Sequence, residues 1–170
     1  MVAVGLLLFW LSMRIPVEAI RKLAPVGLVV AFALLVLVLI PGIGVGLEET
    51  GAQSWIYVGN VSLQPSEVAK VALAVWGAKF LSERLRTATE VKQIFVPFGI
   101  VSVLVLGLVF FQRDLGMVAS MGFVVLALLW FAGLPRYIIG GMVGVGVAVV
   151  GIATLTTGFR SARISVYFNT

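Results

Sequence analysis

The sequence predicts an all-α membrane protein that crosses the bilayer several times. Among its 170 residues, 12 are Lys or Arg and 7 are Asp or Glu, and 61% are hydrophobic. The mean hydropathy is +1.17, whereas soluble domains carry about a quarter charged and about 45–50% apolar residues. Long uncharged stretches separate the few charges, which is the pattern of membrane-spanning helices. An ordinary soluble domain is therefore excluded.

Uncharged stretches mark the expected spans, because a helix of about 20 apolar residues crosses the ~30 Å hydrocarbon core. We expect one domain, residues 1–170, with six transmembrane segments at about residues 1–13, 23–41, 65–82, 93–112, 115–135 and 137–158. The first segment has only 13 uncharged residues and lacks the basic region and cleavage site of a signal peptide. It is interpreted as a truncated helix, and the chain as incomplete at both ends.

Lys and Arg are unevenly distributed between the two sides of the membrane that these spans predict. When the chain alternates between the two sides at each span, residues 14–22, residues 79–92 and Arg136 fall on one side. Together they contain eight Lys or Arg, and three fall on the other side. Because loops rich in Lys and Arg stay in the cytoplasm, the loop 42–64 and the tail after residue 159 are expected to face outward. The net charge of +5 then reflects membrane orientation, and no nucleic acid partner is expected.

The chain contains no Cys and no His. This composition excludes a disulfide framework, a thiolate nucleophile and Cys-ligated metal. It also excludes His-dependent catalytic triads and His-bound zinc, and no metal-ligating residues are assigned. Any chemistry must use carboxylates, Lys, Arg, amides, hydroxyls or the backbone.

Ionisable residues inside an apolar segment mark the first candidate site, because such groups are costly in the membrane unless they are paired or hydrated. In residues 64–70 (QPSEVAK), Pro65 suits the first turn of a helix. Gln64, Glu67 and Lys70 then share one helix face within an arc of about 120°, and Glu67 can pair with Lys70. Two interpretations stay open: a polar cavity for an anionic ligand, or a buried pair that only orients two helices.

The second candidate site is residues 112–116 (QRDLG), which join two apolar runs with almost no loop. One interpretation is a short outer turn whose charges extend into the headgroup layer. In the other, Asp114 turns inward toward the first candidate site, residues 64–70. Arg113 and Asp114 are adjacent, so on a helix they point in different directions and need not neutralise each other.

Three further residues are candidates for contact with an anionic headgroup or a pyrophosphate. Trp55 lies in the outer loop, and Arg160 and Arg163 lie in the tail. Aromatic and basic residues also anchor membrane proteins at the interface, so simple anchoring is the alternative for each of them.

Together these motifs resemble the SEDS family, the polytopic FtsW, RodA and SpoVE proteins of bacterial division, elongation and sporulation. The resemblance rests on residues 51–56 (GAQSWI), followed by QPSEVAK and QRDLG in the family's order. It covers essentially the whole chain, from the second to the seventh of the family's ten helices. The motifs do not separate division, elongation and sporulation members.

Four positions depart from the family's pattern. The family usually has Arg before the loop Trp, where this chain has Gln53 and Ser54. Arg113 replaces the usual Pro, and Met117 replaces a frequent Thr. The missing loop Arg weakens any role of that loop in binding phosphate, and the turn at Asp114 is expected to bend differently without its proline.

The resemblance implies a multi-pass protein of the bacterial cytoplasmic membrane that polymerises lipid II into peptidoglycan. It implies a class B penicillin-binding protein as partner and assigns Gln64, Glu67, Lys70 and Asp114 to the substrate cavity. A divalent cation (Mg²⁺ or Mn²⁺) is the expected cofactor, beside Lys70 at the leaving pyrophosphate. The family's proposed catalytic aspartate would follow Thr170, so no catalytic residue is assigned in this chain, which is expected to be inactive alone.

Two alternative functions stay open. A lipid II flippase would also need a polar cavity among helices, since charges within the membrane mark substrate paths. A non-catalytic membrane scaffold of the division or elongation complex would use the same charges only for packing.

Overall fold

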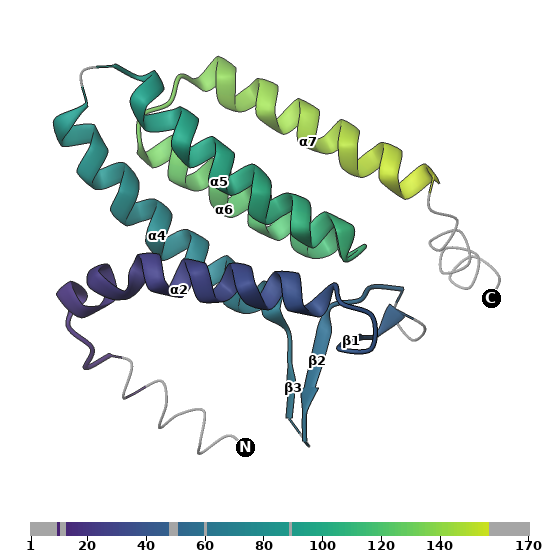
Figure 1. The fold of residues 1–170 in the computed structure, drawn as a ribbon. Helices are drawn as coiled ribbons and strands as arrows, with labels where there is room; N and C mark the ends of the chain where they lie inside the picture. Colours follow the sequence, from purple (N-terminus) through teal and green to yellow (C-terminus); the bar gives the residue numbers. More distant parts are fainter. Residues whose placement is uncertain (1–9, 11–12, 48–50, 60, 89, 157–170) are drawn as a thin grey trace.

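The computed structural model describes residue 10 and residues 13–47, 51–59, 61–88 and 90–156. Most of the expected first segment, residues 1–13, lies outside the described residues, as do Arg160 and Arg163. The described part is mainly helical and carries one small sheet (Figure 1). Its elements are α2 (Val17–Val38), β1 (Gly44–Val45), β2 (Trp55–Val58), β3 (Val61–Leu63), α4 (Pro65–Thr87), α5 (Lys92–Phe111), α6 (Leu115–Phe131) and α7 (Arg136–Thr156).

The helices do not begin and end where the expected spans do: α2 ends at Val38 and α6 at Phe131, before residues 41 and 135. Helix α2 begins before the expected span and includes Glu18, Arg21 and Lys22, and α4 continues to Thr87 through Arg84. Hydropathy marks only the part of a helix suited to the bilayer, whereas charged residues with good helix propensity extend the helix beyond it. Among the described helices, α2 and α5 are long and apolar enough to cross a membrane; α6 and the described apolar part of α7 are shorter.

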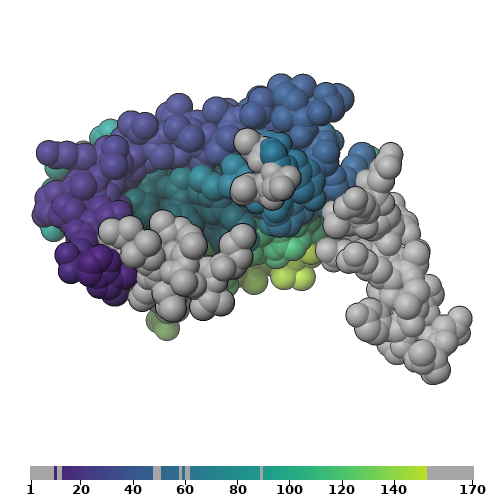
Figure 2. Space-filling model, turned by 90° about the horizontal axis from the view of Figure 1, so that it is seen from below, coloured from purple at the N-terminus to yellow at the C-terminus, as the bar shows by residue number. Residues whose placement is uncertain are grey.

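The helices form a bundle in which α4 packs against α2, α5 and α6, and α7 contacts α6. Helices α5 and α6 lie between α2 and α7 in Figure 1, and α2 runs along the face seen in Figure 2. The core is apolar and includes Leu35, Leu73, Phe98 and Met121, all fully buried. The rings of Trp76 in α4 and Phe98 in α5 stack on each other, with their centroids 6.1 Å apart.

A three-stranded antiparallel sheet occupies the segment that sequence analysis treated as a loop. Strand β2 lies in the middle, with Ile56 opposite both Gly44 and Leu63. The side chain of Ile56 is buried while that of Tyr57 is exposed, as expected of a strand with one covered face. The sheet was not predicted, because strands of two to four residues leave too short an alternation to separate from a loop.

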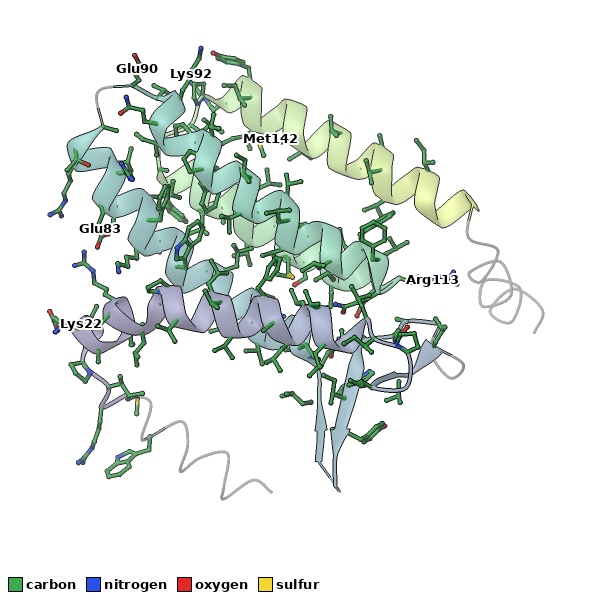
Figure 3. All side chains as sticks on the ribbon, in the orientation of Figure 1. Lys22, Glu83, Glu90, Lys92, Arg113 and Met142 are labelled. Carbon is green, nitrogen blue, oxygen red and sulfur yellow. The ribbon has the colours of Figure 1, made fainter. Side chains whose placement is uncertain are left out.

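The two ends of the bundle differ in character. The sheet and the α5–α6 turn lie at one end, called here the sheet end, where the backbone N–H of Gln53 donates to the carbonyl of Gln112 at 2.9 Å. The starts of α2, α5 and α7 and the end of α4 lie at the other, called here the basic end (Figures 1 and 3). Figure 3 places Lys22 and Lys92 at the basic end and Arg113 at the opposite one.

Candidate functional site at the sheet end

The first candidate cluster lies on the opening turns of α4. Gln64 is the N-cap residue and Pro65 occupies the first turn, as its fixed φ and missing N–H allow. Glu67 follows in the first turn, where the positive end of the helix dipole favours a carboxylate. The Lys70 Nζ lies 2.8 Å from a carboxylate oxygen of Glu67.

The Glu67–Lys70 pair belongs to one helix and is partly open. The Glu67 side chain is 53% exposed and that of Lys70 is 26% exposed. The pair lies off the buried side of α4, which carries Ser66, Ala69 and Leu73. The pair lies within one helix, so by itself it does not tie two helices together, and the ligand-binding interpretation stays a prediction. An ammonium that retains exposure can still bind an anion while Glu67 holds it in place.

Asp114 turns toward this cluster and uses both of its carboxylate oxygens. One oxygen accepts the backbone N–H of Met117 at 3.0 Å and caps the start of α6. The other accepts a hydrogen bond from the side-chain amide of Gln64 at 3.2 Å. Asp114 therefore points inward toward residues 64–70, as one of the two interpretations predicted. Its contacts are those of a capping and positioning residue.

Arg113 points away from the cluster. Its side chain is exposed at the sheet end, as Figure 3 shows, and its φ is +62°. The backbone N–H of Arg113 donates to the carbonyl of Phe110 at 2.9 Å and closes the end of α5. Arg113 and Asp114 thus diverge, and the carboxylate of Asp114 is hydrogen-bonded to Gln64 and to the backbone of α6.

Two glutamines that sequence analysis did not assign hold the sheet end together. The Gln112 side chain is fully buried, and its amide donates to the carbonyl of Leu35 in α2 at 3.5 Å. The Gln53 amide donates to the carbonyls of Val38, at 3.1 Å, and Gly44, at 3.4 Å. Gln53 was visible in the sequence only as a departure from the family's Arg, and contacts between distant segments leave no local signal.

The remaining candidates are Trp55 and the expected divalent cation. Trp55 lies in β2 opposite Val45, so it belongs to the sheet, and its contact with a headgroup stays a prediction. Among the described residues no group of three or more Asp, Glu, His or Cys gathers as a metal site. Glu67 is paired with Lys70, and both oxygens of Asp114 are engaged. The described carboxylates thus do not gather into a group of three, and the divalent cation stays a prediction.

Two described helices apolar and long enough to cross a membrane, with a polar cluster at one end of the bundle, are features of the membrane protein class. Comparison with known proteins identifies the family of the chain. The whole chain, residues 1–170, matches the model of the cell cycle protein family of FtsW, RodA and SpoVE, and the chain belongs to this family. It is 37% identical over 166 residues to the probable peptidoglycan glycosyltransferase FtsW of Mycobacterium tuberculosis, covering 98% of this chain and 31% of that protein.

Two solved structures share the fold. The rod shape determining protein RodA of Thermus thermophilus superposes with a TM-score of 0.72 and 29% identity, covering 86% of this chain and 47% of RodA. A chain from a peptidoglycan synthase complex that polymerises and crosslinks matches with a TM-score of 0.73 and 26% identity, over 99% of this chain and 48% of that one. The chain thus spans less than half the length of these relatives.

Proposed function

We propose that this chain is part of a peptidoglycan glycosyltransferase that polymerises lipid II at the outer face of the bacterial cytoplasmic membrane. The family membership and the activity named for the Mycobacterium tuberculosis relative support this proposal. The observation that carries it is the Glu67–Lys70 pair, which presents a partly exposed ammonium on the first turns of α4.

In the proposed reaction, a sugar hydroxyl of one lipid II attacks the anomeric carbon of the growing strand. The new glycosidic bond forms as the bond to the lipid pyrophosphate breaks, and a base outside the described residues takes the hydroxyl proton. Lys70 binds the pyrophosphate and offsets the charge that develops on it. Glu67 orients Lys70 from 2.8 Å, and the Gln64–Asp114 hydrogen bond fixes the start of α4.

The family resemblance also leads us to propose a class B penicillin-binding protein as the partner that crosslinks the product. The structural relative from a synthase complex that combines polymerization with crosslinking supports such an arrangement. A divalent cation beside the pyrophosphate would need ligands from outside the described residues, and no step above depends on it.

The test replaces the ammonium and measures polymerisation of purified lipid II by the full-length protein. Lys70→Ala should reduce the rate at least tenfold, and Glu67→Gln should reduce it less because Lys70 keeps its charge. Lys79→Ala, on the same helix toward the basic end, is the matched control and should polymerise normally. Unfolding titrations in detergent check that the variants are folded.

Normal polymerisation by Lys70→Ala would exclude the assigned role. Two other outcomes would favour the alternatives. Loss of lipid II flipping in reconstituted vesicles, with polymerisation intact, would favour a flippase. Loss of stability in proportion to activity in both variants would favour a scaffold that uses the pair only for packing.

A further inference from the structure

The basic end of the bundle carries a net charge that the proposed reaction does not use. Three described acidic residues, Glu18, Glu83 and Glu90, lie in its segments. Its eight basic residues are Arg14, Arg21, Lys22, Lys79, Arg84, Arg86, Lys92 and Arg136. The difference is +5, which equals the net charge of the whole chain. This end therefore attracts anionic headgroups in the membrane leaflet that it faces.

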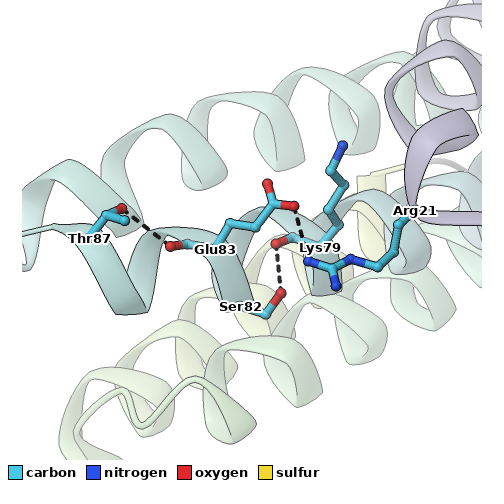
Figure 4. Close-up of polar contacts among 5 residues, drawn as sticks. All are labelled: Arg21, Lys79, Ser82, Glu83 and Thr87. Atoms are coloured by element: carbon cyan, nitrogen blue, oxygen red, sulfur yellow. Dashed lines mark hydrogen bonds and ion pairs between the residues drawn. The ribbon is translucent and has the colours of Figure 1, made fainter. Parts of the chain in front are cut away.

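Two arginines from neighbouring helices are held at this end. Arg21 of α2 contacts the carboxylate of Glu83 on α4 at 3.2 Å, and both side chains remain about half exposed. Figure 4 shows the ion pair between Arg21 and Glu83, with Lys79 four residues before Glu83 on the same helix. The guanidinium of Arg84 lies 5.7 Å from the centre of the Phe80 ring. Arginine binds phosphate through paired N–H groups, which suits a phospholipid headgroup.

An apolar groove runs between α2 and α5. It is lined by Leu28, Val29, Phe32, Val101, Leu104 and Val105, with essentially no polar surface. Along α2 these residues lie six to ten positions beyond Lys22, and a rise of 1.5 Å per residue places them about 9–15 Å deeper. Half of the hydrocarbon core is about 15 Å thick. The α2 wall of the groove therefore lies at the depth of the acyl chains of the leaflet that meets the basic end.

We propose that one anionic glycerophospholipid, such as phosphatidylglycerol, binds here, with one acyl chain in the groove and its phosphate at Arg21 and Arg84. The positive charge selects an anionic headgroup, and the apolar lining selects a hydrocarbon chain. Separately, neither feature specifies a lipid; together they provide a cationic group for the phosphate and an apolar wall for the acyl chain. The proposal rests on the membrane orientation given above but not on glycosyltransferase activity.

The experiment measures phospholipids retained by the purified full-length protein after exchange into mixed micelles of equal phosphatidylglycerol and phosphatidylcholine, using native mass spectrometry. The unsubstituted protein should retain phosphatidylglycerol selectively. Arg21→Gln and Arg84→Gln should each weaken retention about fivefold, as expected when one basic group no longer attracts an anionic lipid. Arg113→Gln, at the sheet end, should have no effect.

A second pair of variants tests the groove. Val29 and Val103 are almost equally exposed, at 69% and 68%, but only Val29 lines the groove. Val29→Trp should fill the groove and abolish selective retention, whereas Val103→Trp should leave it intact. Leu104→Trp fills the same groove from α5 and replaces Val29→Trp if that variant does not fold.

Three results would overturn the proposal. If neither arginine substitution changes retention, the headgroup site is excluded. If the groove-filling variants do not change retention, the acyl-chain site is excluded and only a general electrostatic attraction to anionic lipid is left. When undecaprenyl phosphate is added to the same micelles in an equal amount, its preferential retention over phosphatidylglycerol would show that a different lipid occupies the site. Because lipid retention is measured without substrate, failure here is distinguishable from failure of the Lys70 polymerisation test.

Discussion

At the scale of single residues, α5 and α6 are terminated by the same backbone conformation at two different residue types. Each helix ends in a residue with positive φ, Arg113 at +62° after α5 and Gly133 at +82° after α6. The N–H of Gly133 donates to Trp130 and that of Leu134 donates to Leu129, the hydrogen-bond pattern typical of a glycine C-cap. The backbone N–H of Arg113 makes the bond equivalent to that of Gly133, to the carbonyl of Phe110. Positive φ is unfavourable for arginine, because it carries a Cβ.

This comparison predicts the effect of two substitutions at Arg113. Arg113→Gly should stabilise the protein by about 0.5–1 kcal/mol, since glycine adopts positive φ without steric cost. Arg113→Pro should destabilise it by about 3 kcal/mol or more, because proline fixes φ near −65° and removes the N–H that bonds to Phe110. Unfolding in detergent measures both changes.

Gly133→Ala is the matched control for the conformational argument, and it should destabilise the protein where Arg113→Gly stabilises it. Equal stabilities for Arg113→Gly and Arg113→Pro would show that the turn does not require positive φ. The difference from the family's usual proline would then have no conformational meaning.

At the scale of elements, the junction of α4, α5 and α6 depends on the absence of a side chain. A Cβ at Gly77 would lie 2.8 Å from Leu128 of α6 and 2.8 Å from the ring of Phe98 of α5. The Phe98 ring is fully buried and stacks on Trp76, which limits its freedom to move. The three helices therefore approach one another closely at this position.

We predict that Gly77→Ala destabilises the protein by about 1–3 kcal/mol, the usual cost of overpacking a close contact. Gly99→Ala is the control, because a Cβ at Gly99 has open space around it and alanine favours a helix by about 1 kcal/mol over glycine. Stability curves for both variants in the same detergent compare them. A Gly77→Ala variant as stable as Gly99→Ala would contradict the proposed close packing.

At the scale of the whole molecule, the two ends should face opposite compartments. The chain has no Cys, so a cysteine introduced here reports the orientation once any cysteine elsewhere in the full-length protein has been replaced. Tyr57→Cys lies on an exposed position of β2 at the sheet end. It should react with a membrane-impermeant maleimide in intact cells whose outer layers admit the reagent.

Lys92→Cys, at the basic end, should react only after the membrane is made permeable. If Lys92→Cys alone is labelled in intact cells, the predicted orientation is wrong and the basic end faces outward. That orientation would place the Glu67–Lys70 pair toward the cytoplasm, where an outer-face polymerase cannot use it.

The sequence predicted the parts of this molecule that depend on local composition. Uncharged runs predicted both ends of α5 to within one residue and the start of α6, although α6 ends at Phe131, four residues before the expected end. The three-residue spacing predicted the Glu67–Lys70 contact. It offered the inward turn of Asp114 only as one alternative, because the choice depends on Gln64, 50 residues away. The contacts of Gln53 and Gln112 were missed for the same reason, since they join segments with no shared pattern.

The hydrogen bond between Gln64 and Asp114 has a mechanical consequence. These are the N-cap residues of α4 and α6, so the bond sets both helices to begin at a common height. If one helix slides along the membrane normal, the bond draws the other with it. A loss of activity on substituting Asp114 would thus report a shift in alignment as readily as lost chemistry, and only a structural readout measured in parallel separates the two.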